Sequence, residues 1–242
     1  MHPALVIFLI LLGGLLSIVP FVYLNIRRTG ETRLLLPAPE SSHGNQHRMA
    51  ESHGRWAKHF GFEWIGGYTF RSLQKSFIGA WRHTDQPVFF LLEMANGSTH
   101  YHFISIFNRK QELTSTSQNG LVVPRPKGDY VQRFPKASLT DLFMHHAAGH
   151  DFLLTEGHAK LAPYALRVDR ALVNGLARQY AHVTAMKAWP LRALAWVLIE
   201  PRRADGHTIA DQLADVPPAH AKPPELQEEP SDDTDAKSDL ES

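Results

Sequence analysis

The sequence predicts an α+β domain that follows an N-terminal transmembrane helix and precedes a disordered, acidic C-terminal tail. Three observations support this prediction: an apolar segment of membrane-spanning length at the start, a central series of strand-like segments separated by turn residues, and helical patterns on both sides of that series. This order favours a mostly antiparallel sheet of about five strands packed with helices. The predicted boundaries are 1–28 for the anchor, 29–44 for a linker, 45–203 for the soluble domain with its helical part at 138–203, and 204–242 for the tail.

Residues Ala4 to Leu24 form an unbroken apolar segment that is predicted to span a membrane once. Fifteen of these 21 positions are Leu, Ile, Val or Phe, and none is charged. As a helix the segment is ~31 Å long, close to the ~30 Å hydrocarbon core of a bilayer, and its large apolar residues contribute roughly −5 to −9 kcal/mol to insertion. A cleaved signal peptide is the alternative. It is disfavoured because the first three residues carry no Lys or Arg and the bulky residues 20–24 do not suit a cleavage site.

The positive charges beside this segment predict its orientation. Arg27, Arg28 and Arg33 all follow it, and none precedes it. Because cytoplasmic flanks carry the excess of Lys and Arg, we expect the C-terminal domain in the cytoplasm. The lipid bilayer is thus the first predicted partner, and the predicted location is the membrane, in a single pass.

The composition of the remaining chain narrows the function classes. Without anchor and tail, about 170 residues remain, which suits one domain. The chain has no cysteine, which excludes disulfides, thiolate nucleophiles and Cys-based zinc sites. Phosphate-binding loops, dinucleotide-binding glycine motifs, serine-hydrolase elbows and kinase motifs are all missing. Lys and Arg do not gather on one element with interleaved aromatics, so no nucleic-acid partner is predicted.

The C-terminal segment Pro217 to Ser242 is strongly acidic. It holds eight acidic residues and two lysines, a net charge of −6, so the rest of the chain carries +7 within the total of +1. Rich in Pro, Ser, Asp and Glu, it cannot bury enough apolar surface to offset its ordering entropy, and we expect disorder. A solubilising role is the simplest interpretation, and recruitment of a protein partner is the alternative.

The elements of the soluble domain follow from periodicity and turn residues. An amphipathic helix is predicted from Gln46 to Phe60, where apolar residues recur at helical spacing and a glycine follows. Asn96-Gly97 is the strongest turn signal and indicates a two-residue type I′ hairpin. Pro and Gly interrupt Val122 to Phe134, which predicts an edge strand or an ordered loop. The five predicted strands are Trp64–Phe70, Ser76–Trp81, Val88–Met94, Thr99–Phe107 and Glu112–Ser117.

Two helices are predicted after the strands. Ser138 and Asp141 have the spacing of a capping box, which opens a helix extending to Glu156 and ending at Gly157. A longer helix is predicted from Ala165 to Ala188.

The hairpin register places three chemically capable side chains on one face of the sheet. If Asn96-Gly97 forms the loop, Glu93 lies opposite His100, and His102 lies two residues further along the same face. Two imidazoles and a carboxylate could bind a divalent transition metal or form a general acid–base pair. A cross-strand ion pair without catalytic function is the simpler interpretation.

A second histidine cluster lies on the helix that Ser138 opens. His146 and His150 are four residues apart and so share a helix face, a spacing that suits two metal ligands. The HExxH motif is absent, so a third ligand would come from elsewhere, such as Asp151, His158 or the Glu93 face. Apolar neighbours on the His146 face favour a hydrogen-bonded core histidine instead.

Three function classes fit these observations. The favoured one is a membrane-anchored cytoplasmic binding or scaffolding domain without catalysis or a cofactor, which accounts for the anchor, the tail and the missing motifs. The second is a carrier of lipid or another small ligand, because an aromatic-rich sheet under helices can enclose a pocket. The third is a hydrolase or oxidoreductase that uses a divalent transition metal held by the histidine clusters.

Overall fold

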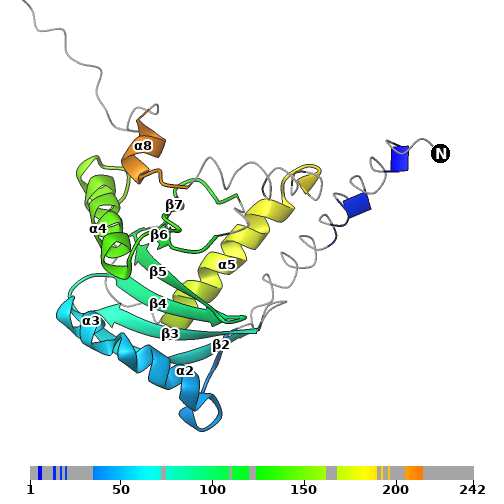
Figure 1. Ribbon diagram of the computed structural model, residues 1–242. Coiled ribbons are helices and arrows are strands. Elements are labelled where there is room, and N and C mark those ends of the chain that lie inside the picture. Colours follow the sequence, from blue (N-terminus) through cyan, green and yellow to red (C-terminus); the bar gives the residue numbers. More distant parts are fainter. Residues whose placement is uncertain are drawn as a thin grey trace, which may run out of the picture.

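A seven-stranded sheet with helices on both faces forms the centre of the described part of the chain (Figure 1). The computed structural model describes residues 5–6, 13–14, 17, 20, 35–71, 75–108, 111–119, 124–161, 168–189, 192, 196 and 205–214. The α+β class predicted from the sequence is therefore confirmed. The predicted transmembrane segment lies mostly outside the described residues. Among the residues described, no helix has the length and apolar character needed to cross a bilayer.

The strands follow one another across the sheet in chain order. All neighbours pair antiparallel except β6 and β7, which are parallel. The prediction of about five strands missed β1, which has only three residues, and left β7 open as an edge strand or a loop. The strands are β1 (Leu35–Pro37), β2 (Phe62–Arg71), β3 (Lys75–His83), β4 (Val88–Ala95), β5 (Ser98–Ile106), β6 (Glu112–Thr116) and β7 (Tyr130–Arg133).

The hairpin between β4 and β5 has the predicted geometry. Ala95 pairs with Ser98 across a two-residue loop. Asn96 and Gly97 both have positive φ, 51° and 78°, as a type I′ turn requires. The turn fixes the register of the two central strands, and with it the face on which each side chain lies.

Three helices cover the first face of the sheet: α2 (Glu40–Ser52), α3 (Gly54–His59) and α4 (Leu139–Thr155). Gly67 and Gly79 are paired neighbours on β2 and β3, and a Cβ on Gly67 would lie 2.8 Å from the His47 ring of α2. This pair of glycines therefore lets α2 approach the sheet closely. Below the helices lies an aromatic core of Trp56, Phe62, Phe77, Trp81, Phe90 and Phe103.

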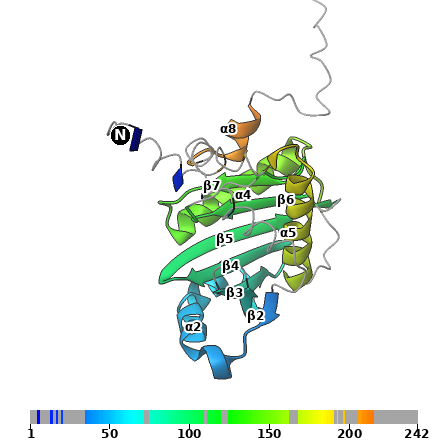
Figure 2. The ribbon, with the colours of Figure 1, turned by 90° about the vertical axis from the view of Figure 1, so that its right-hand side faces the viewer.

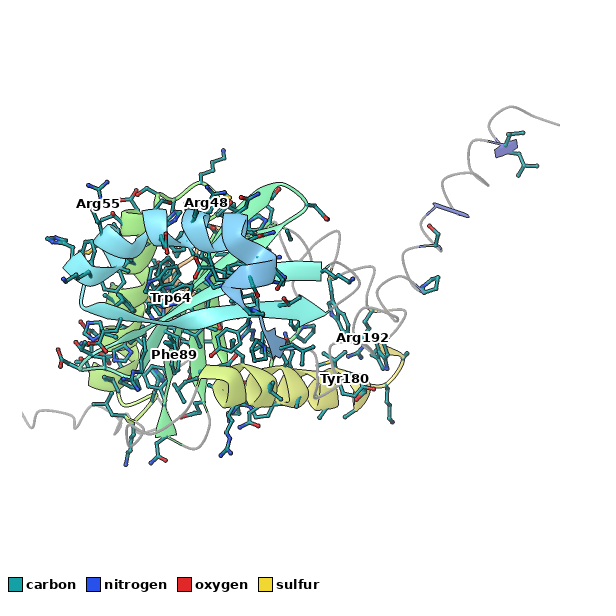
Figure 3. The ribbon with its side chains drawn as sticks, turned by 90° about the horizontal axis from the view of Figure 1, so that it is seen from below. Arg48, Arg55, Trp64, Phe89, Tyr180 and Arg192 are labelled. Carbon is teal, nitrogen blue, oxygen red and sulfur yellow. The ribbon has the colours of Figure 1, made fainter. Side chains whose placement is uncertain are left out.

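Helix α5 (Val168–Thr184) covers the opposite face, so that the sheet lies between two helical layers (Figure 3). Figure 3 places Trp64 beside α2 and Phe89 on the α5 side. The apolar side chains under α5 are smaller than those on the first face, and Ala171 of the helix is buried against them. They are Ile78, Ala80, Phe89, Leu91, Ile104 and Ile106.

Three predicted boundaries differ from the structure. Residues 35–44, assigned to a linker, contain β1 and the start of α2, which begins at Glu40 instead of Gln46. The single helix expected up to Phe60 is divided at His53 into α2 and α3. Residues 205–214, assigned to the disordered tail, contain a β-bridge and the short helix α8 (Ile209–Leu213). Residues 215–242 lie outside the described part.

Candidate functional site

The first histidine cluster lies on the α5 face, where the hairpin places it. Glu93 is opposite His100 in the register, as predicted, and its carboxylate is hydrogen-bonded to His102, with 3.2 Å between Oε2 and Nε2. The side chains of Glu93 and His102 are 18% and 14% exposed. The structure thus brings together a carboxylate and an imidazole in a partly desolvated setting.

The electrostatics of this cluster keep its carboxylate ionised. Burial alone would raise the pKa of Glu93, but the hydrogen bond and the charge of His102, together with smaller contributions from Ser76 and His100, outweigh it, and the net pKa is lowered. Burial lowers the pKa of His100, and the charge of His102 lowers it further, against the opposing effect of Glu93. The carboxylate therefore stays ionised at neutral pH and accepts a hydrogen bond from the imidazole of the neighbouring strand.

The second cluster is part of a buried hydrogen-bonded chain between α4 and the sheet. His146 Nε2 lies 2.8 Å from Ser105 Oγ of β5, and His146 Nδ1 lies 2.8 Å from Ser115 Oγ of β6. Ser105 Oγ also lies 2.8 Å from His150 Nδ1. At the other end, the amide Nε2 of Gln132 on β7 donates to Ser115 Oγ at 2.8 Å.

Only one direction of donation gives every hydroxyl proton of this chain an acceptor. Gln132 can only donate from its amide nitrogen, so Ser115 accepts from it and donates to Nδ1 of His146. His146 then donates from Nε2 to Ser105, and Ser105 donates to Nδ1 of His150. The opposite direction leaves the Ser115 proton without an acceptor in the chain. Both histidines are therefore assigned as neutral, with the proton on Nε2.

Burial keeps His146 neutral. Its exposed fraction is 1%, and desolvation, together with the nearby His150, lowers its pKa from 6.5 to about 3. Burial also lowers the pKa of His150, against the raising effect of Asp151. Sequence reasoning predicted one hydrogen-bonded core histidine, and the structure buries two.

The two histidine clusters lie on opposite faces of the sheet. His102 and Ser105 are three residues apart on β5, so their side chains point to different sides. Glu93 therefore cannot supply a third ligand to the His146 cluster, which corrects one possibility raised from the sequence. Within the described ranges, no three His, Asp or Glu side chains are grouped so that they could hold a metal ion.

A charged cluster that sequence reasoning missed ties α5 to the sheet. Glu112 of β6 accepts a hydrogen bond from Arg125 at 2.6 Å and pairs with Arg178 of α5 at 3.3 Å. Arg178 also pairs with Asp129 at 3.1 Å. Burial and the charge of Glu112 raise the pKa of Asp129, and the two arginines oppose this. Two positive and two negative groups thus neutralise one another where they are largely shielded from water.

One glycine makes this cluster possible. A Cβ on Gly175, in the middle of α5, would lie 2.6 Å from Glu112 Oε2. The signal available from sequence was this glycine itself, because a glycine inside a strong helical pattern often marks a close approach. The glycine alone does not indicate which residue approaches the helix, or that this residue is charged.

Comparisons with known proteins give no relative from which a function could be transferred. No family model, no curated protein and no solved structure matches the chain.

Proposed function

We propose that the protein is a single-pass membrane protein whose cytoplasmic domain binds or scaffolds a partner without catalysis. The observation that carries this proposal is that both histidine clusters take part in contacts within the domain. The hydrogen-bonded chain through His146 joins α4 to three strands, and Glu93 is hydrogen-bonded to His102 of the neighbouring strand. The apolar segment Ala4 to Leu24 and the arginines after it support the anchor and its orientation.

The serine–histidine chain argues against a hydrolase. A serine nucleophile beside a histidine base needs access to its substrate. Ser105 and Ser115 are both 0% exposed, and His146 is 1% exposed. A histidine whose pKa is about 3 is also a weak base at neutral pH. These groups are better suited to fixing α4 on the sheet than to proton transfer with a bound substrate.

The aromatic side chains argue against the carrier alternative. Phe90 lies against Trp81 and Phe103, with ring centroids 4.7 and 5.1 Å apart, and both phenylalanines are fully buried. Rings at these separations contact one another directly. The aromatic side of the sheet is thus filled by its own side chains, as in an ordinary core.

The charge distribution suggests where partners bind. The acidic segment 217–242 carries −6, while the rest of the chain carries +7. A basic body is favourable next to an anionic leaflet, and an acidic tail can attract a basic protein partner. We include a protein partner of the tail in the proposal.

Fractionation tests the anchor. The full chain should stay in the membrane pellet after an alkaline wash, and a chain lacking residues 2–28 should be soluble. Protease added outside intact cells should leave a C-terminal tag uncut until the membrane is opened. Retention of the shortened chain in the pellet would contradict the architecture, and cleavage in intact cells would contradict the orientation.

Elemental analysis tests the non-catalytic assignment. The soluble chain, purified without a histidine tag, should carry no stoichiometric zinc, iron or manganese. One equivalent of such a metal would place the metal-dependent enzyme first. The variants Glu93→Ala, His100→Ala and His146→Ala would then identify the ligands, with His102 and His150 tested next.

A further inference from the structure

The outer edge of β7 is covered by a segment from the end of the domain. Gly206 N donates to the carbonyl of Arg133 at 2.7 Å, and Asp205 forms a parallel bridge with Arg133. Gln212 donates from its side chain to the carbonyl of Val131 at 2.9 Å. We call residues 205–214 the latch. It lies beside β7 and α4 (Figures 1 and 2).

The latch inserts one apolar side chain into the domain. Ile209 is 0% exposed and packs in a cluster with Phe107 and Leu113 of the sheet side and Leu153 of α4. Most other latch residues are exposed. By contrast, α4 buries five of its residues. The latch is thus held by one fully buried side chain, the partly buried Leu213 beside it and a few hydrogen bonds, as a bound peptide is.

The contacts define a short recognition pattern. The Asp205 carboxylate lies 3.4 Å from Nη1 of Arg133, a side chain only 4% exposed. That nitrogen has no hydrogen-bond partner among the described residues, so this acidic group supplies its counter-charge. Thr208 and Asp211 form a capping box that starts the helical turn carrying Ile209.

Strand addition at a sheet edge is a general mode of peptide recognition, in which backbone hydrogen bonds give affinity and side-chain pockets give specificity. We propose that the β7 edge and the apolar residues around Ile209 form a peptide-binding site that the latch occupies. The partner is a protein segment of the same pattern, namely an acidic residue, a glycine, and a capped helical turn with a buried aliphatic side chain. These contacts lie within the domain and do not depend on the anchor, and the site gives the proposed partner-binding function a place in the fold.

The site is connected to the buried histidine chain through one amide. Gln132 Oε1 accepts a hydrogen bond from the backbone N–H of Ile209 at 3.2 Å, while its Nε2 donates to Ser115. Without the latch, Gln132 Oε1 loses its hydrogen-bond donor. The surroundings of the Gln132 amide, which begins the hydrogen-bonded chain to His146, therefore change. The imidazole ¹⁵N resonances of His146 and His150 therefore report on whether the edge is occupied.

Peptide binding to the full chain tests the proposal. The probe is a fluorescein-labelled synthetic peptide of residues 204–214, measured by anisotropy with the protein in detergent micelles. The variant Ile209→Asp opens the site and should bind the probe at least tenfold more tightly than the wild type, whose own latch competes. A peptide carrying the same Ile209→Asp change should not bind saturably.

A second variant keeps the test valid if Ile209→Asp prevents the domain from folding. The double substitution Thr208→Ala and Asp211→Ala removes the helix cap at positions outside the core and should also increase probe binding. Probe binding should return the His146 and His150 resonances of Ile209→Asp toward their wild-type positions. Equal Kd values for wild type and both variants, or equal binding of the altered peptide, would overturn the proposal. A dimer that exchanges latches would support the site and name a second copy as the partner.

Discussion

The hydroxyl of Ser105 lies 2.8 Å from His146 Nε2 and 2.8 Å from His150 Nδ1, so that one serine of β5 joins two histidines of α4. All three residues are buried. A helix that presents two imidazoles to a sheet would carry a large desolvation cost without such partners. The hydroxyl therefore determines how α4 is seated on the sheet.

Replacing this serine with Ser105→Ala should destabilise the domain by about 1–3 kcal/mol, because it leaves both imidazoles short of a buried partner. Chemical denaturation of the full chain measures the change. Ser98→Ala is the matched control, since Ser98 is exposed on the same strand and its loss should change stability by less than about 0.5 kcal/mol. Equal effects of the two substitutions would contradict the role given to Ser105.

Stability should fall with acid because of His146. Its folded-state pKa, about 3, is below its ordinary 6.5, so between these values the unfolded chain binds a proton that the folded chain does not. The free energy of unfolding should therefore fall by about 1 kcal/mol per pH unit from this residue as the pH decreases from 6.5 toward 3. In His146→Gln this contribution should vanish, and denaturant titrations at pH 7 and pH 5 compare the two slopes. Parallel slopes would refute the assignment.

Adding one methyl group at Gly175 should loosen α5. The new Cβ of Gly175→Ala would lie 2.6 Å from Glu112 Oε2 and push the carboxylate away from Arg178. We expect a loss of about 1–3 kcal/mol and faster hydrogen exchange along α5. Gly44→Ala is the control, because its Cβ meets nothing within 4 Å and alanine favours a helix. A stabilised Gly175→Ala would show that the helix adjusts freely.

The hairpin turn offers a different test, in which space is not limiting. A Cβ on Gly97 meets no atom within 4 Å, but its φ of +78° is unfavourable for residues with a Cβ. Gly97→Ala should cost about 1–2 kcal/mol from backbone strain alone. Gly97→Asn should recover part of that loss, because asparagine tolerates this conformation better. Thermal unfolding of both variants tests the order, and an equal loss would contradict it.

The sheet was predictable wherever strand signals were local. The pattern of β2 to β6 and the turn at Asn96-Gly97 gave the strands and the register that places Glu93 opposite His100. The strand β1 was not predictable, because three residues give no periodicity and its pairing with β2 depends on residues far along the chain. The latch was assigned to the tail because its composition is polar: Ile209 is its one fully buried residue, and Leu213 is only partly buried against the same cluster.

The chemistry of the sites was predictable only in part. Helical spacing identified His146 and His150 as one face of α4, but it could not identify Ser105 and Ser115 as their partners, because serines in strands carry no distinguishing pattern. The cluster around Glu112 depends on three separate segments of the chain. Long-range partners of this kind follow from the packing of α5, and a single sequence does not encode that packing in its periodicity.

The late position of the latch has a consequence for the newly made chain. The antiparallel strands β2 to β6 pair with sequence neighbours and can assemble early. The bridge between Arg133 and Asp205 can form only after residue 205 has been made. At about 5–20 residues per second, the outer edge of β7 stays uncovered for several seconds of synthesis. An uncovered edge is a template for aggregation, and the latch removes this risk only after its own residues have been made.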